Sequence, residues 1–468
     1  MTEKLAKGSS KLDNGLFIFR RDLRIVDNNG LNFLSELCKN IYTIFIFTPE
    51  QVGSNNKYKS DNSVQFMIES LEDLSQQIKR QGGKLYTFYG NNNKVIADCI
   101  KAWDIDVVAF NLDITPYARE RDDKIVKLCQ SMKVFVTYDH DYFLHNPGSI
   151  RNGSGGAYQK FTPYYNTASK IKVEPPISLR KIPLKSNEAH IPNKMSLGQA
   201  LQRFTTINPN ILVHGGRTHA IKQMRIAAKN IKHYSSTRDD PKKPTSQLSA
   251  FIKFGCVSIR EVYHTFRANH SFTRQLYWRD FYANIVYEYP HVIGHNLNPK
   301  YDKITWHHNE RLFNAWAKGM TGIPIVDASQ RQLLATGWTH NRCRMVSSSI
   351  LVKILLIDWR KGEQFYAKHL VDYDVANNNG GWQWSSGGGS DSQPWFRYFN
   401  PYLQSKEHDP QCEYIKTWIP ELKDVPAKAI HNWEAECENY TDAKYPKPIV
   451  NYADQKEKSI KMYKDALY

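Results

Sequence analysis

Hydrophobic residues in the first 140 positions form short continuous runs that alternate with amphipathic stretches. Between residues 64 and 78, apolar side chains recur every three or four positions and a Gly82-Gly83 pair follows, so this stretch predicts one long helix. The continuous runs are rich in β-branched and aromatic residues and predict five buried strands, at 16–20, 41–48, 84–90, 107–112 and 133–139. Strands that alternate with helices predict a parallel sheet with both faces covered. No GxGxxG segment follows the first strand, so a dinucleotide site of the usual type is not expected there.

The chain beyond residue 140 follows a different pattern. Residues 141–200 contain NPGSIRNGSGGAY and several prolines, which indicate a long connection between domains. From residue 201 to residue 468 the apolar periodicity is helical, with interruptions at Gly255 and in the turn-rich segment 377–391, and no convincing strand run follows. We therefore expect an α/β domain at 1–140, a linker at 141–200 and an all-α domain at 201–468.

Charge and aromatic content narrow the classes of partner. The 468 residues include 63 Lys and Arg against 46 Asp and Glu, and this surplus of 17 positive charges favours polyanions such as nucleic acid. All 11 tryptophans except Trp103 lie between residues 278 and 468. A large helical core uses tryptophan as bulk, and for any single Trp this interpretation competes with a functional one.

Cysteine spacing and the terminal segment bear on the cellular compartment. The seven cysteines are scattered without CxxC spacing, and His307-His308 has no evident third ligand, so neither a disulfide framework nor a metal site is expected. The segment MTEKLAKGSSK has no apolar signal region, and the longest apolar stretch, SILVKILLIDW, is short and contains Lys353. We therefore expect a soluble intracellular protein, cytoplasmic or nuclear, that does not span a membrane.

A first candidate site is the segment TSQLSAFIKFG (245–255). It places Thr245, Ser246 and Ser249 at the start of an apolar periodic run. Hydroxyls and free N–H groups at a helix N-terminus suit a phosphate, and the same residue types serve as ordinary helix caps. The sequence alone leaves both interpretations open.

A second candidate is TGWTHNRCRM (336–345), which offers Asn341, Arg342 and Arg344 without an acidic residue beside them. Two arginines with an amide between them suit successive phosphates and a base edge, whereas a solvated basic helix face is the alternative. His340 is expected to be a hydrogen-bonded core or hinge residue.

A third candidate is LVDYDVANNNGGWQW (370–384). Asp372 and Asp374 do not share a helix face, which indicates that the chain leaves a helix around a bound group. The glycine pair at 380–381 permits close backbone approach to a large flat ligand. A capped helix end followed by a turn is the alternative, which explains the amides and glycines but not the neighbouring acids and indoles.

Together these segments resemble one known family. The chain is similar to the DNA photolyases and cryptochromes over essentially its full length, and most to the class I photolyases that repair cyclobutane pyrimidine dimers. The matching segments are FRRDLRIVDN (19–28), FTPYYNTA (161–168), TSQLSAFIKFG (245–255), QLYWRDFY (275–282), GIPIVDASQRQLLATGWTHNRCRM (322–345), IDWRKGEQFYAKHLVDYDVANNNGGWQWSS (357–386), FRYFNP (396–401) and YPKPIV (445–450). The resemblance implies an N-terminal domain of Rossmann-like topology and a helical domain that binds FAD. It also implies a reaction in which the light-excited reduced flavin gives an electron to a dimer flipped out of the duplex.

The resemblance further implies a role for each matching residue. Residues similar to the FAD contacts are Tyr234, Thr245, Ser246, Gln247, Leu248, Ser249, Arg279, Asp372, Asp374 and Asn378, with the Asn378 amide facing flavin N5. The tryptophan chain that relays electrons from the surface to the flavin corresponds to Trp306, Trp359 and Trp382. Residues similar to the lesion pocket are Gln275, Trp278, Asn341, Met345 and Trp384, and DNA phosphates are expected to meet Arg342, Arg344 and Arg397.

The pocket residues favour one lesion. Enzymes of the family that repair (6-4) photoproducts carry proton-donating histidines where this chain has Asn341 and Met345, so cyclobutane dimers are favoured. Gln275 departs from class I enzymes, which typically carry a glutamate there, because Gln brings no negative charge and no titratable proton. A signalling cryptochrome is the alternative class, although such proteins commonly add a long C-terminal tail and only 18 residues follow YPKPIV here. A flavin-free nucleic-acid-binding module would leave the acidic residues of 370–384 unexplained.

A second, antenna chromophore is also implied for the first domain. Its identity stays open between a deazaflavin, a folate and a flavin, or none. Folate-using members carry Asn-Glu before an ARxRD stretch, where this chain has Pro116-Tyr117 in TPYARERD (115–122). The implied partner is DNA that contains pyrimidine dimers, and we expect the protein to act as a monomer.

Overall fold

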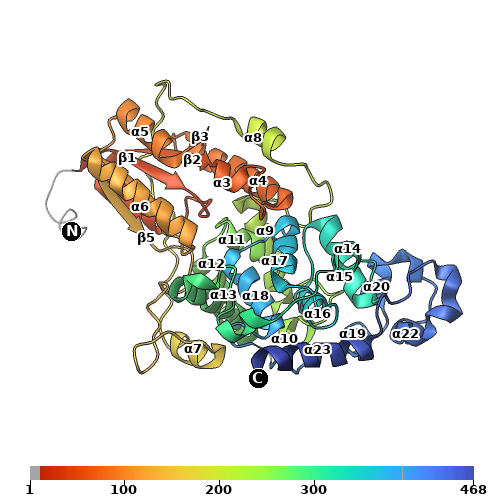
Figure 1. The fold of residues 1–468 in the computed structure, drawn as a ribbon. Coiled ribbons are helices and arrows are strands. Elements are labelled where there is room, and N and C mark those ends of the chain that lie inside the picture. Colours follow the sequence, from red (N-terminus) through yellow and green to blue (C-terminus); the bar gives the residue numbers. More distant parts are fainter. Residues whose placement is uncertain (1–10, 393) are drawn as a thin grey trace.

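The computed structural model describes residues 11–392 and 394–468 (Figure 1). Its N-terminal part is a five-stranded sheet in the order β3-β2-β1-β4-β5, and every neighbouring pair of strands is parallel. The strands are β1 (Leu12–Phe19), β2 (Cys38–Phe47), β3 (Leu85–Tyr89), β4 (Val107–Asn111) and β5 (Phe135–Asp139). All five predicted strands are therefore present, and so is the predicted parallel α/β class.

Alternation of side chains along β1 separates the two faces of this sheet. Leu16 and Ile18 contribute to a core with α5 (Asn92–Trp103) and α6 (Pro116–Ser131). Phe17 and Phe19 face the other way and join a second core with α2 (Asn29–Leu37) and α4 (Asp61–Arg80). Successive strand residues point to opposite faces, so continuous apolar runs are needed to fill both cores.

Two expectations about this domain have different outcomes. The predicted helix at 64–78 is confirmed as part of α4, which begins after Ser60 because the Ser60 side chain accepts a hydrogen bond from the Ser63 N–H. The prediction that 133–139 is buried is wrong: β5 is one of the two edge strands, and Phe135 and Tyr138 are 46% and 52% exposed. An edge strand has one neighbour only, and its periodicity does not reveal that position.

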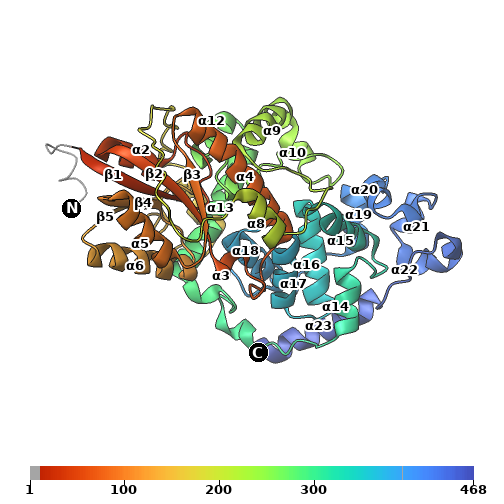
Figure 2. The ribbon, with the colours of Figure 1, turned by 90° about the horizontal axis from the view of Figure 1, so that it is seen from above.

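The connection at 141–200 is mostly irregular, as predicted, but it contains α7 (Phe161–Ala168) and the start of α8 (Leu197–Phe204). The helical part lies beside the sheet, and the C-terminal helices extend away from it (Figures 1 and 2). Its helices are α9 (Arg217–Asn230), α10 (Tyr234–Thr237), α11 (Ser249–Lys253), α12 (Ile259–Phe266), α13 (His270–Glu288), α14 (Glu310–Ala317), α15 (Pro324–Thr336), α16 (Asn341–Lys353), α17 (Trp359–His369), α18 (Val375–Ser386), α19 (Pro401–His408), α20 (Glu413–Trp418), α21 (Ala427–Ile430), α22 (Trp433–Glu436) and α23 (Tyr452–Leu467). Every strand in the described ranges lies before residue 140, in agreement with the predicted all-α second part.

The sheet and the helical part share a continuous core. Phe66 of α4 packs against Phe251 and Phe254, with ring centroids 5.3 and 5.2 Å apart. Beside this contact, Arg260 of α12 reaches the buried carboxylates of Asp27 (3.0 Å) and Asp141 (2.7 Å). Buried ion pairs of this kind fix geometry because breaking one leaves an uncompensated charge.

The segment 377–391 is a turn only from residue 387 onward, and not over its first ten residues as its composition predicts. Residues up to Ser386 belong to α18, which begins after Asp374 because that carboxylate accepts from the Asn377 N–H at 3.1 Å. The two acidic residues therefore lie in the short connection where the chain leaves α17 at His369, as predicted, and enters α18 at Val375. A Cβ on Gly380 would come within 2.2 Å of the Tyr282 ring, so this glycine allows α18 to pack closely on α13. Tertiary packing thus overrides the low helix propensity of Asn and Gly.

Candidate functional site

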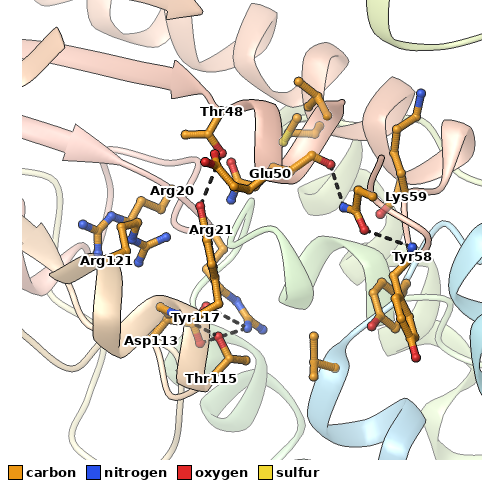
Figure 3. A pocket seen from close by; sticks show the side chains of 18 of the residues that line it. Arg20, Arg21, Thr48, Glu50, Tyr58, Lys59, Asp113, Thr115, Tyr117 and Arg121 are labelled. Atoms are coloured by element: carbon orange, nitrogen blue, oxygen red, sulfur yellow. Dashed lines mark hydrogen bonds and ion pairs between the residues drawn. The ribbon is translucent and has the colours of Figure 1, made fainter. Parts of the chain in front are cut away.

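The first cavity, called here the strand-end cavity, has a volume of about 650 Å³. It opens at the carboxyl ends of β1, β2 and β4, where Arg20, Thr48 and Asp113 line it (Figure 3). In the strand order 3-2-1-4-5, the helix that follows β1 and the helix that follows β4 cover opposite faces of the sheet. Ligands of open α/β sheets bind where the direction of the strand order changes, which here is between β1 and β4. The topology alone therefore places a binding site here.

Cationic side chains dominate one wall of the strand-end cavity. Arg20 and Arg121 share the carboxylate of Asp122, at 2.7 and 2.9 Å, yet one guanidinium nitrogen of each arginine is buried without a hydrogen-bond partner. Burial and the neighbouring Arg121 lower the pKa of Arg20 to about 10. Figure 3 shows Tyr117 reaching from α6 toward Thr48, and their hydroxyls are 3.4 Å apart. This wall offers donors and an aromatic ring to a polar, electron-rich ligand.

The second cavity, called here the helical cavity, has a volume of about 520 Å³. Helices α13, α16 and α18 supply most of its lining, with α10 and α11 at one end. Most predicted site residues line it: Tyr234, Ser246, Leu248, Ser249, Gln275, Trp278, Arg279, Asn341, Arg344, Met345, Asp372, Asp374, Asn378, Trp382 and Trp384. The structure thus brings the predicted flavin contacts and the predicted lesion contacts into one space.

The remaining predicted residues do not line this cavity. Thr245 and Gln247 flank Ser246 in the turn before α11, and Gln247 has a left-handed backbone with φ of 53°. Arg397 is exposed in the connection between α18 and α19. Trp359 is fully buried and Trp306 is 8% exposed, and both pack with Trp382 in one hydrophobic cluster. Of the three tryptophans, only Trp382 lines the helical cavity, and Trp306 is the most exposed.

Arg342 and Arg344 were expected to have no acidic partner, but both form ion pairs. Arg342 bonds Asp239 at 2.7 Å, and Arg344 bonds Asp372 at 3.1 Å. Both carboxylates come from segments distant in sequence, which is why local inspection missed them. His340, as predicted, is a buried structural residue: it caps α16, and its Nδ1 accepts from the Arg342 N–H at 3.1 Å.

Two polar groups set the electrostatics of the helical cavity. Burial alone would raise the pKa of Asp374, but Arg21, at 2.7 Å, and Arg279 outweigh this effect and hold that pKa well below its usual range. Asn378 donates one side-chain N–H to the Glu363 carbonyl at 3.0 Å, which leaves the amide oxygen and the second N–H available to a ligand. A fixed anion and a fixed acceptor thus face the same space.

Aromatic rings form the other side of the helical cavity. Trp278 stacks on Phe161 with ring centroids 3.7 Å apart and an interplanar angle of 10°, so its orientation is fixed from behind. Trp384 packs at 6.2 Å on Phe399. Gln275 uses its side-chain nitrogen to bond the Ser271 carbonyl at 3.2 Å, one turn earlier in α13. Flat apolar surfaces with one amide between them suit a stacked base.

The lining of the helical cavity also fits a flavin dinucleotide. A Cβ on Gly381 would meet no atom within 4 Å, so at this residue the α18 backbone is open to a large flat group, whereas Gly380 packs on Tyr282 instead. Ser246, Ser249 and Tyr234 provide hydroxyl groups at the far end. Polar groups at both ends of an apolar slot match a ligand with a ring system at one end and phosphates at the other.

The two cavities share a wall. Lys253, Tyr373 and Asp374 line both cavities, and Arg21 of the strand-end cavity bonds Asp374 across this wall. Asp374 was predicted, whereas Arg21, Lys253 and Tyr373 were not. The available signals were a pair of arginines at a strand end and a lysine inside an apolar run.

Comparisons with known proteins agree with this architecture. The model of the "FAD binding domain of DNA photolyase" matches residues 272–465, and the "DNA photolyase" model matches residues 16–181. A deoxyribodipyrimidine photo-lyase from Halobacterium salinarum is 33% identical, over 96% of this chain and 99% of its own length. The crystal structure of an archaeal photolyase from Sulfolobus tokodaii, described with two FAD molecules, has 37% identity and a TM-score of 0.87, and the match covers 97% of this chain and 100% of that one. A cryptochrome from Synechocystis sp. PCC6803 has 25% identity and a TM-score of 0.88, over 97% and 100% of the two chains.

The fold and these matches define a flavoprotein in which a helical FAD-binding domain packs on a parallel-sheet domain. The chain belongs to the DNA photolyase family. The predictions that it is an enzyme of the photolyase type and that it binds FAD are confirmed. No helix in the part of the chain that the structure describes is both long and apolar enough to cross a membrane.

Proposed function

We propose that this enzyme repairs cyclobutane pyrimidine dimers in DNA with light. The observation that carries the proposal is the helical cavity, where Asn378 and Asp374 for a flavin and Trp278 and Trp384 for a base line one open space. A bound reduced FAD supplies the light-excited electron that splits the cyclobutane ring. The relatives named deoxyribodipyrimidine photo-lyase support the same lesion class.

On this proposal each side of the cavity has its own task. Trp278 and Trp384 stack against an extruded dimer, and the buried face of Trp278 is held by Phe161. Asn378 presents a fixed acceptor, and Asp374 and Arg279 hold the polar edge of the cofactor. Arg342, Arg344 and Arg397 hold DNA phosphates. Because Arg342 and Arg344 are already paired with carboxylates, Arg397 carries most of the salt-sensitive affinity.

The tryptophan set is proposed as the route by which the cofactor is reduced. Trp382 lines the helical cavity, Trp359 is fully buried, and Trp306 lies nearest the surface. Gly362 brings α17 against the Trp382 ring, since a Cβ there would come within 2.2 Å of it. Trp359 begins α17, the same helix that Gly362 brings against Trp382, so the two tryptophans lie on neighbouring helices. A relay of this kind reduces the flavin without substrate.

The choice of cyclobutane dimers over (6-4) photoproducts follows from the proton donors available. Asn341 and Met345 line the cavity and contact each other, with the Asn341 nitrogen 3.5 Å from the Met345 sulfur. Neither is an acid. His340, the adjacent histidine, is fully buried, and burial lowers its pKa to about 4, so it does not serve as a proton donor to a lesion.

The strand-end cavity supports a second chromophore. We propose that it holds a flavin or deazaflavin that passes excitation to the FAD of the helical cavity. Its position at the strand ends, its unpartnered guanidinium nitrogens and the ring of Tyr117 suit a polar tricyclic ligand. The Sulfolobus tokodaii structure with two FAD molecules, described as implying a novel light-harvesting cofactor, supports this assignment.

Illumination of the reduced protein with defined oligonucleotides tests the function. One oligonucleotide contains a cyclobutane thymine dimer, a second a (6-4) photoproduct, and a third is undamaged. We expect light-dependent restoration of the two thymines in the first alone. Restoration of the second instead would assign (6-4) repair, and flavin binding without restoration of either would favour a photoreceptor.

A further inference from the structure

Lys253 occupies the wall between the two cavities. It is the last residue of α11, lies one turn after Ser249, and lines both the strand-end cavity and the helical cavity. Residues four apart on a helix share a face, so Ser249 and Lys253 border the helical cavity together. Neither the flavin contacts nor the lesion contacts inferred above include this lysine.

The other cations of this wall each have a carboxylate. Arg21 bonds Asp374 at 2.7 Å, Arg344 bonds Asp372 at 3.1 Å, and Arg279 lies 3.5 Å from Asp280. Among residues 11–392 and 394–468, Lys253 Nζ has no ion pair and no hydrogen bond. It lies over the Phe254 ring, 3.5 Å from the ring centroid. A cation without an anion therefore borders two spaces that are large enough for nucleotides.

The surroundings of Lys253 make a bare ammonium unfavourable. Burial, together with the charge of Arg21, lowers the pKa of Lys253 to about 7, against the opposing effects of Asp374, Asp113 and Asp372. These three carboxylates are too few to hold the ammonium because Arg21 and Arg344 already use them. An anion that entered either cavity would supply the missing charge.

We propose that Lys253 binds a phosphate group of a flavin nucleotide. The inference rests on the proposed function, since it assigns the ligand class of the two cavities. An ammonium offers three donors to phosphate oxygens, and a low-dielectric wall strengthens this pairing. Two sources present the same chemistry: the diphosphate of FAD in the helical cavity and the phosphate of a nucleotide in the strand-end cavity.

Binding titrations with the flavin-free full-length protein test the proposal. The variants are K253M, K253R and, as a matched control, K353M. Lys353 is likewise buried, with a pKa lowered to about 8, but its Nζ donates to the Arg397 carbonyl at 2.7 Å and it lines neither cavity. The probes are FAD, FMN added after saturation with FAD, and riboflavin, which has no phosphate. Quenching of flavin fluorescence reports each affinity.

We expect K253M to weaken phosphate-bearing probes by about 10- to 100-fold, the range of one charge-assisted hydrogen bond. Riboflavin affinity should stay unchanged, K253R should retain most of the affinity, and K353M should match the wild type. Loss with FAD assigns the helical cavity as the source of the phosphate, and loss with the subsequent FMN assigns the strand-end cavity. Unchanged affinity for both nucleotides, or equal weakening of riboflavin, would overturn the proposal.

The pH dependence gives a second readout that a purely structural lysine would not produce. A phosphate stabilises the ammonium form, so nucleotide binding takes up a proton and wild-type affinity falls as the pH rises above about 7. Glu363 and Asp280 also have pKa values raised to about 7 by burial, and K253R keeps both, so the difference between wild type and K253R isolates Lys253. If the wild type itself bound no FAD, the proposed function would fail; if K253M bound both FAD and FMN as tightly as the wild type, only this inference would.

Discussion

The two cavities differ in what determines them. The strand-end cavity is built from loops after β1, β2 and β4, and its place follows from the sheet order alone. The position of the helical cavity does not follow from the order of its helices. This cavity exists because side chains on α13, α16 and α18 leave space between closely packed helices. Topology locates the first site and says little about its ligand, whereas residue identity defines the second.

Their charges differ in the same sense. In the helical cavity Asp372 and Asp374 are both paired with arginines, so that wall is preorganised. In the strand-end cavity Arg20 and Arg121 leave guanidinium nitrogens unsatisfied in the interior. Preorganised charges suit catalysis, because the side chains need not reorganise when charge develops in the transition state. Unsatisfied donors suit the binding of a ligand that supplies the missing acceptors. This difference agrees with the proposed functions, which are repair in the helical cavity and binding of a second chromophore in the strand-end cavity.

Filling each cavity in turn should separate the two tasks most strongly. Leucine at Gly381 would project into the helical cavity, where no atom lies within 4 Å of a Cβ, and leucine at Ala118 would project into the strand-end cavity. G381L should weaken FAD binding by about 100-fold or more and abolish repair, because the ligand loses its space. A118L should keep FAD and keep repair by direct flavin excitation. Bound flavin absorbance and dimer repair measure both, and loss of repair in A118L with FAD still bound would break the comparison.

Tryptophan substitutions should give the next largest effect, and they should separate photoreduction of the flavin from repair. W306F and W359F are expected to slow photoreduction of the bound flavin by about 10-fold or more, because the relay is interrupted, while repair by chemically reduced enzyme stays nearly intact. The control is W103F, in the sheet domain, where the buried Trp103 stacks on Tyr42 at 5.1 Å. Flavin absorbance during illumination with a reductant gives the rate. Equal loss of photoreduction and repair would refute the separate relay.

Sequence reasoning located the fold because both signals it used are local. The five strands are apolar runs and α4 is a periodic run, so each is visible within a short window. It failed where the answer lay elsewhere in the chain. The exposure of β5 depends on what covers it, since β3 is also an edge strand but is bonded by residues 193–195 and mostly buried, and the helical state of 377–386 depends on Asp374 and on Tyr282. Neither dependence is encoded in the segment itself.

The candidate site shows the same division. The site residues were predicted from short sequence motifs, and most of them do line the helical cavity. Partners across the fold were not found: Asp239 for Arg342, Asp372 for Arg344, and Arg21 for Asp374 are separated by 28 to 353 residues. The strand-end cavity was missed as a geometric object because its lining is spread from Ile18 to Val375 without a shared motif. Charge pairing and cavity shape are tertiary properties.

Arginine substitutions should give a moderate effect confined to the helical side. Arg397 is exposed in the connection between α18 and α19, and R397A is expected to lower dimer-DNA affinity by about 10-fold and to reduce the slope of log affinity against log salt by about 1. R180A is the control, since Arg180 is exposed on the sheet side and pairs with Glu36 at 2.8 Å. Fluorescence anisotropy at several salt concentrations measures both. A wild-type affinity that did not change with salt would contradict the phosphate contacts.

A smaller effect is expected from the cap beside the helical cavity. His340 must be neutral to cap α16, and burial lowers its pKa from 6.5 to about 4. Between these pH values the unfolded chain binds a proton that the folded chain does not, so stability falls as the pH drops from 6.5 toward 4. H340N keeps a capping side chain and removes this component, while H340A should lose about 1 kcal/mol at neutral pH. Denaturant unfolding at pH 7 and pH 5 gives the values, with H190A as an exposed control. A steeper acid loss in H340N than in wild type would exclude this assignment.

The smallest change is expected at Gln275, and it tests how far preorganisation of the helical cavity reaches. The Gln275 nitrogen donates one N–H to the Ser271 carbonyl at 3.2 Å, which leaves its oxygen and its second N–H for a base in the cavity. In Q275E the carboxylate cannot donate to Ser271, but two charged oxygens are offered to the N–H groups of a dimer, and charge-assisted bonds are stronger. Repair by reduced enzyme should therefore be maintained or rise by about 3-fold, a change of less than 1 kcal/mol. The quantum yield of dimer splitting measures this, with FAD content as the control. A drop of about 10-fold with FAD retained would mean that the Gln275–Ser271 bond orients the cavity wall, and the wall would then be less rigid than its paired charges indicate.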